Sequence, residues 1–153
     1  MVALVDALDR FDPRAAAEAG CDLARVLWVR GPGVTAGASA VLLQRAVHQA
    51  VRACDLIVRA KGFAVVALDV ADVSPRQLRA LPLATWMRLA RANEGQPTVC
   101  LLIGPAPLGR SARGATVELS GTATWTGTSA QSRRLSGIAI NAGVKGTGVR
   151  THG

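Results

Sequence analysis

Two aspartates stand where an acidic side chain could take part in chemistry. Asp6 follows the apolar run of residues 2–5, and Asp69 follows the apolar run of residues 63–68. Each run predicts a buried strand, and the carboxyl ends of parallel strands meet at the ligand crevice of an open α/β sheet. A carboxylate there can hold magnesium through water when a phosphate group is bound nearby. Without a phosphate-binding loop, however, both acids are better interpreted as caps or as relics of a nucleotide site.

The nearest imitation of a phosphate-binding loop is the Gly-rich segment GPGVTAGAS, residues 31–39. It joins a predicted strand to a predicted helix, so its backbone N–H groups could face an anion. The chain has no G-x-x-x-x-G-K-[ST] motif, and this segment lacks the lysine that reaches the β- and γ-phosphates. We therefore interpret it as a connecting loop and expect no catalytic residue, no nucleotide cofactor and no enzymatic activity.

Arginines supply the strongest positive signal in the sequence. Lys and Arg number 18 against 10 Asp and Glu, which gives a formal net charge of +8. Two pairs of arginines, each spaced by three residues, lie on predicted helices, and a third pair follows in a loop: Arg76, Arg79, Arg88, Arg91, Arg110 and Arg113. Arginine binds phosphates and carboxylates through paired hydrogen bonds. These six residues are predicted to bind DNA phosphates or an acidic protein; a merely solvated helix surface is the alternative.

Cysteine and histidine do not form a recognisable site in this sequence. Cys21, Cys54 and Cys100 are far apart and show no C-x-x-C spacing, and the two histidines are His48 and His152. This set predicts neither a zinc site nor a disulfide framework. We expect three buried, reduced thiols, as in a cytoplasmic protein. His48 falls on the polar side of a predicted helix, where it is expected to be solvated.

The elements that must position these residues alternate between strands and helices. The pattern predicts strands over residues 2–6, 25–30, 63–68 and 97–103, and helices over residues 13–20, 40–60, 75–81 and 83–93. Such alternation is typical of an α/β fold with a mostly parallel sheet flanked by helices. Two further strands, residues 115–119 and 134–140, predict a C-terminal antiparallel hairpin added to the sheet edge, with residues 121–129 as turn.

Composition limits the chain to one modest domain. Of its 153 residues half are apolar, but aromatic residues make up only 3% and tyrosine is absent. We expect one domain over residues 1–141, with a small core of Ala, Val and Leu, and a disordered tail over 142–153. The longest apolar run has six residues, whereas a membrane helix needs about 20. The N-terminus lacks a basic region, so we expect no signal peptide, no membrane contact and a cytoplasmic protein.

The order of motifs resembles that of RecA recombinases over residues 2–141. VALVDALDRFDPRAAAEAGCDLARVLWVRGP resembles the stretch after the phosphate loop of that family, and FAVVALD resembles its Walker B strand, with Asp69 on the acid. LATWMRLARANEGQPTVCLLIGP resembles the helix and strand that follow. ARGATVELSGTA resembles the strand after the second DNA-binding loop, and SRRLSGIAI resembles the last strand.

The departures from this family bear on activity. The catalytic glutamate falls on Leu8, with Asp9 one place off, and the glutamine that couples the γ-phosphate to the DNA loop falls on Pro105. The chain also starts where the phosphate loop is expected to have passed. Asp6 and Asp69 are then relic positions of a nucleotide site. The resemblance therefore implies a RecA-like domain that does not hydrolyse ATP.

Known proteins of this degenerate kind suggest what such a domain does. ImuA-type proteins accompany a specialised polymerase in SOS mutagenesis, and the retained Asp-Pro and Arg-rich helices bring this chain closer to them. The resemblance implies an accessory role in DNA repair, recombination or translesion synthesis, with RecA-like or polymerase-type repair proteins and single-stranded DNA as partners. Self-association through the strand edge near residues 115–119 is also expected. The alternatives are a fragment of a RecA-type DNA-dependent ATPase and a SulA-type division inhibitor.

Overall fold

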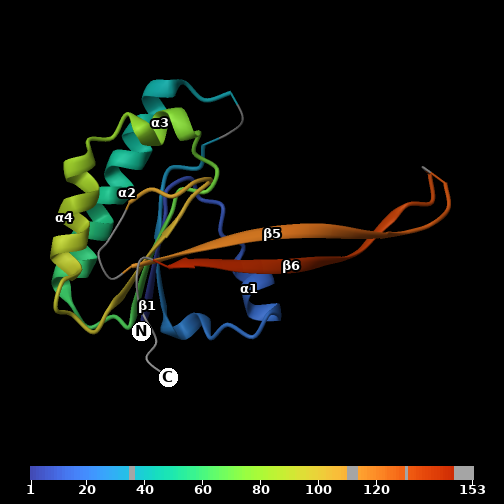
Figure 1. The fold of residues 1–153 in the computed structure, drawn as a ribbon, viewed down its shortest axis with the longest axis horizontal. Coiled ribbons are helices and arrows are strands. Elements are labelled where there is room, and N and C mark those ends of the chain that lie inside the picture. Colours follow the sequence, from blue (N-terminus) through green and yellow to red (C-terminus); the bar gives the residue numbers. More distant parts are fainter. Residues whose placement is uncertain (35–36, 110–113, 130, 147–153) are drawn as a thin grey trace. The chain divides into compact units, whose positions relative to one another are not determined.

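The computed structural model describes residues 1–34, 37–109, 114–129 and 131–146. Within it the chain forms two compact units, Met1–Gly109 and Arg110–Gly153. The first unit contains four strands and four α-helices, and the second contains two long strands (Figure 1). No helix in the described ranges is long and apolar enough to cross a membrane.

The first unit is built on a four-stranded parallel sheet. Its strands are β1 (Val2–Asp6), β2 (Val26–Arg30), β3 (Val65–Asp69) and β4 (Val99–Ile103), in the order β2-β1-β3-β4. All three pairings are parallel, which confirms the predicted α/β class. Each strand has five residues and starts at or just after its predicted start, because the flanking residues enter the sheet without completing the ladder.

Helix α2 (Ala40–Ala60) covers the centre of this sheet and contributes six residues to the core. Ser39 caps its first turn by accepting a hydrogen bond from the Leu42 amide, and the helix has the predicted bounds. Its buried side is small and aliphatic, which lets it lie close to β1 and β3: Ala46, Val47, Ala50, Val51, Cys54 and Val58. His48 is exposed on the opposite side, as expected.

Two shorter helices complete the cover on the same side of the sheet (Figure 1). Helix α3 (Pro75–Arg79) starts behind the Ser74 cap, and α4 (Leu83–Asn93) starts behind Pro82, which lacks the amide needed to continue α3. Trp86 and Leu89 bury the inner side of α4, which packs along α2. The remaining helix, α1 (Pro13–Glu18), has no buried residue and connects β1 to β2 through a short 3-10 turn, Leu23–Arg25.

The second unit is one antiparallel hairpin, β5 (Ala115–Thr126) with β6 (Arg134–Gly146). The hairpin was predicted, but its extent was not. Residues 121–126, expected as turn, continue β5, and residues 142–146, expected in a tail, pair with residues 115–119. The strands form a two-stranded sheet of their own and are not hydrogen-bonded to the parallel sheet as an added edge. Alternating threonines explain the longer strand, because β-branched residues favour extended backbone.

Candidate functional site

Asp6 and Asp69 lie side by side at the carboxyl ends of two neighbouring strands. They are register partners in the β1–β3 pairing. The chain turns from β1 to β2 on one side and continues from β3 to β4 on the other, so the strand order reverses between β1 and β3. Open α/β sheets bind ligands at such a switch point. A cavity of about 210 Å³ opens here, lined by Asp6, Leu8, Arg10, Asp69, Val70, Ala71 and Asp72.

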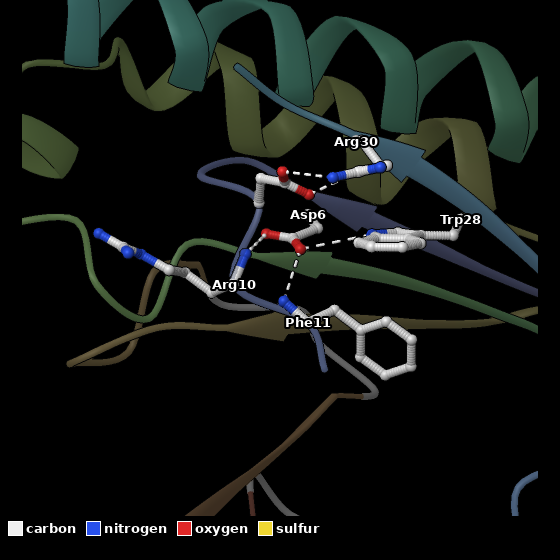
Figure 2. A network of polar contacts seen from close by, with 6 residues as sticks. Asp6, Arg10, Phe11, Trp28 and Arg30 are labelled. Atoms are coloured by element: carbon white, nitrogen blue, oxygen red, sulfur yellow. Dashed lines mark hydrogen bonds and ion pairs between the residues drawn. The ribbon is translucent and has the colours of Figure 1, made fainter. Parts of the chain in front are cut away.

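Asp6 is buried, and its two carboxylate oxygens hold the loop that follows β1. Oδ1 accepts a hydrogen bond from the Arg10 amide at 3.0 Å, and Oδ2 accepts one from the Phe11 amide at 2.8 Å (Figure 2). Oδ2 also accepts a bond from Nε1 of Trp28 on β2 at 3.3 Å. Asp6 therefore works as a cap that joins the loop to the sheet, which is one of the two roles predicted for it.

The loop after β1 passes very close to Gly31, the residue that follows β2. The Gly31 amide donates to the Asp6 carbonyl at 2.7 Å, and a Cβ atom on Gly31 would lie 2.1 Å from the carbonyl oxygen of Ala7. Only glycine fits such an approach. This close backbone contact explains why Gly31, the first glycine of the Gly-rich segment 31–39, is a glycine.

Arg30 and Asp9 close the outer side of the same loop. Arg30 donates to both carboxylate oxygens of Asp9, at 2.8 and 2.7 Å, and its guanidinium lies 4.5 Å from the ring centre of Trp28 (Figure 2). The hydrogen bond from Arg30 lowers the pKa of Asp9 below its ordinary value. Phe11 meets the Trp28 ring edge to face, with centroids 5.3 Å apart. These contacts fix Asp9 against Arg30, so it is not held ready as a general base.

Asp69 is less constrained than Asp6. Its Oδ1 accepts a hydrogen bond from the Ala71 amide at 2.9 Å. Partial burial raises the pKa of Asp69 above its ordinary value, and the carboxylates of Asp6 and Asp72 add to the rise, while the bond from Ala71 opposes it. Asp72 forms an ion pair with Arg10 at 3.3 Å across the cavity.

In the strand-end cavity both oxygens of Asp6 accept hydrogen bonds from the protein, whereas at Asp69 the described hydrogen bond, from the Ala71 amide, reaches one oxygen. Leu8 is buried and offers no proton acceptor. In the described part of the chain, no three His, Cys, Asp or Glu side chains are grouped so as to hold a metal ion. What the geometry does provide is a rigid end to the sheet, maintained by Asp6 and the Arg30–Asp9 pair.

Basic side chains gather at a second place, between α2 and α4. A groove of about 470 Å³ is lined by Arg59, Ala84, Met87, Arg88, Arg91 and Ala92. Its three arginines are exposed and come from two helices, and the small and thioether side chains form an apolar floor. Such a combination suits an anionic chain that carries apolar parts between its charges.

Asp55 orients two of the three groove arginines. Its Oδ2 accepts a hydrogen bond from Nε of Arg59 at 3.1 Å, and its Oδ1 lies 4.0 Å from Nε of Arg88. Asp55 is mostly buried, and Oδ1 accepts no hydrogen bond within the described residues. One acid against three arginines leaves a net positive groove, with Arg91 outside any ion pair that the described residues form.

The structure brings together only part of the predicted basic surface. Arg88 and Arg91 line the groove, whereas Arg76 and Arg79 are exposed on α3 and do not line it. Arg110 and Arg113 lie outside the described residues. Arg59 was missed, because the sequence assigned it to the solvated side of α2; its spacing of four residues from Asp55 was the available signal.

The cysteines differ from the prediction of three buried thiols. Cys54 is buried, Cys100 is half-buried and Cys21 is exposed. Cys21 follows Gly20, the residue that ends the turn after α1, and α1 buries nothing; no core lies beneath this thiol. Contact with Cys100, together with burial, raises the pKa of Cys54.

Similarity to known proteins was sought by three comparisons. Family models, curated proteins and solved structures all return no match to this chain. The function must therefore be inferred from the two sites described above and from the sequence pattern.

Proposed function

We propose that this protein is a non-hydrolysing RecA-like accessory protein of DNA repair, which binds the phosphates of single-stranded DNA through the α2–α4 groove. The observation that carries the proposal is the gathering of Arg59, Arg88 and Arg91 around an apolar floor. A positively charged groove that follows the backbone is typical of sequence-tolerant binding to single strands. The link to the SOS response and translesion synthesis rests on the RecA resemblance alone.

The strand-end cavity supports the non-hydrolysing part of the proposal. The resemblance to RecA assigns the acidic residues of a nucleotide site to Asp6 and Asp69. These two residues end neighbouring strands at the switch point. Both oxygens of Asp6 already accept hydrogen bonds from the protein, and Leu8 is buried. Phosphoryl transfer depends on positioned charges and a positioned nucleophile. We expect no ATP hydrolysis by the purified protein, with or without single-stranded DNA; a DNA-stimulated turnover would favour the ATPase alternative.

The salt dependence of binding tests the DNA part. With three phosphate contacts, log K for a labelled single-stranded oligonucleotide should fall with log salt at a slope of about −2, from roughly −0.7 per contact. The double variant Arg88→Ala with Arg91→Ala should flatten this slope by about 1.4. Fluorescence anisotropy across a salt series measures both slopes.

A matched variant separates the groove from general charge. Arg76→Ala with Arg79→Ala removes the same charge at the same spacing from α3, outside the groove. It should leave the slope unchanged. Equal losses in the two double variants would assign binding to net charge, and unchanged slopes in both would remove the DNA proposal. A polyglutamate competitor of equal charge that displaces DNA at lower concentration would assign the groove to an acidic protein partner.

A further inference from the structure

The hairpin of β5 and β6 has two chemically different faces. Residues directly opposite each other in an antiparallel pair share a face, and successive residues along a strand alternate between faces. The pairs Val117–Val144, Leu119–Ala142 and Ala123–Ile138 therefore lie on one face. The residues between them on β5 are polar and lie on the other face: Thr116, Glu118, Ser120, Thr122 and Thr124.

The apolar face is continuous along the whole hairpin. Gly121 opposes Ile140, and the ideal Cβ of a side chain at 121 would lie 3.1 Å from Cγ2 of Ile138, so isoleucine side chains fill that gap. A bulge after Thr124 shifts the register by one residue on β6. Trp125 then opposes Leu135, which keeps both side chains on the apolar face. The charged pair Glu118–Lys145, at 2.5 Å, belongs to the polar face. Among the described residues, Arg133 brings charge near the apolar face, with its guanidinium 5.3 Å from the Trp125 ring, and it does so at the turn end.

This face is large and uncovered. Seven side chains expose between 49% and 71% of their surface: Val117, Leu119, Trp125, Leu135, Ile138, Ile140 and Val144. Together they present on the order of 700 Å² of apolar surface, close to the roughly 800 Å² that each partner contributes to a standard protein interface. A two-stranded hairpin is marginally stable alone in water and needs packing against a further layer.

We propose that the apolar faces of two hairpins, from two copies of this chain, pack against each other as a four-stranded β-sandwich. Such an interface is isologous, because the same patch meets itself across a two-fold axis. We place this two-fold axis between the two apolar faces, perpendicular to the strands and opposite the Gly121–Ile140 pair. It sets the turn end of one copy against the open end of the other. That arrangement keeps the two Arg133 side chains apart, although the whole chain carries a charge of +8. The surface differs from the strand edge expected from the sequence, because it uses side chains and not backbone hydrogen bonds.

Neighbouring residues on β6 offer a matched test. Ile140 lies on the apolar face and Asn141, which opposes Ser120, lies on the polar face. The full chain is expected to be a dimer by light scattering across the micromolar range. Ile140→Lys should lower the dimer affinity at least tenfold, because it buries a charge in the interface. Asn141→Lys adds the same charge one residue away and should leave the dimer intact.

Further measurements keep the proposal falsifiable if Ile140→Lys unfolds the hairpin. Leu119→Thr places a β-branched residue, which favours extended backbone, in β5 while removing apolar surface, and should also weaken the dimer. In the parent chain, protection of the β5 and β6 amides from hydrogen exchange should rise with protein concentration. A parent that stays monomeric, equal effects of the two lysine variants, or amides protected at every concentration would each overturn the proposal. The last outcome would assign the apolar face to a contact within one chain.

Discussion

The two units of this protein place their apolar side chains in opposite situations. In residues 1–109, side chains of β1, β3, α2 and α4 form a core that includes Val5, Val47 and Leu68, each nearly inaccessible to water. In the hairpin, every side chain of β5 and β6 for which burial is described, apart from Thr116, is exposed. In both units the spacing of apolar residues matches the secondary structure, with a period of two along the strands and of three to four along the helices. The two units differ in how one strand is connected to the next.

A parallel strand must be followed by a crossover, and two of the three crossovers in the first unit carry helices that cover the sheet: α2 on one, and α3 with α4 on the other. An antiparallel strand returns through a short turn and brings no cover with it. The first unit therefore supplies its own cover, whereas the hairpin has no element of its own to cover its apolar face. This comparison implies that substitutions in the two units should have unequal effects on stability, which the following variants measure.

The largest contrast is expected between two leucines. Leu68→Ala in β3 removes a fully buried side chain and should lower the free energy of unfolding by about 3 kcal/mol. Leu119→Ala in β5 changes a residue outside that core, so it should change the free energy of unfolding of the first unit by less than about 0.5 kcal/mol. Urea denaturation followed by helical circular dichroism reports the first unit, which contains all the described helices. Similar losses in both variants would break the comparison.

A smaller effect is expected from the carboxylates. Asp6→Ala leaves two amides and the Trp28 indole without their acceptor, and should cost about 3 kcal/mol at most, because water reaches part of the loop. Glu118→Ala in the hairpin breaks an ion pair that is solvated, and should produce no measurable change. Thermal melts of the two variants beside the parent check this pair. If Asp6→Ala melts with the parent, the loop is not held by that carboxylate.

The smallest expected effect concerns Asp69 and depends on pH. Because the folded protein raises the pKa of Asp69, the folded state retains that proton to higher pH than the unfolded chain does. Ionisation of Asp69 therefore lowers stability as pH rises from the ordinary value of 3.8 through the raised value. Asp69→Asn keeps an oxygen for the Ala71 amide and removes the charge. It should be slightly more stable than the parent at neutral pH, with the gain lost below pH 3.8.

Denaturation curves at several pH values measure that difference. A gain that is the same at every pH would trace to the amide group and not to ionisation. No corresponding gain is expected in the hairpin, because the pKa of Glu118 is lowered by its hydrogen bond from Lys145. The pH dependence thus separates a carboxylate that is partly desolvated in the first unit from one that is solvated in the second.

Local signals in the sequence account for most of the first unit. Ser39 before α2, Ser74-Pro75 before α3 and Pro82 before α4 each act within one helical turn, so helix starts follow from a few neighbouring residues. The continuous apolar runs of β1 and β3 likewise require burial on both faces. The pairing of Asp6 with Asp69 could be anticipated, because strands of equal type end at one edge of a sheet.

Other features depend on contacts between distant residues and were not accessible in this way. The indole of Trp28 meets Asp6 across a sequence gap of 22 residues, and Arg59 joins Arg88 only because α2 and α4 pack together. The hairpin was underestimated for a different reason. Thr, Ser and Gly in residues 121–129 favour turns locally, and only the facing apolar residues of β6 reveal that residues 121–126 belong to a strand.

Gly31 has a consequence for how relatives of this protein should be compared. Any side chain at that position would collide with the backbone of Ala7, whatever the protein binds. Glycine is thus enforced by the geometry of the turn in each descendant that keeps this crossing of β1 and β2. Its retention across an alignment would carry no information about a ligand, even though it stands at the head of a Gly-rich loop. Arg59, Arg88 and Arg91 face no such steric requirement, so only their retention would report selection for binding.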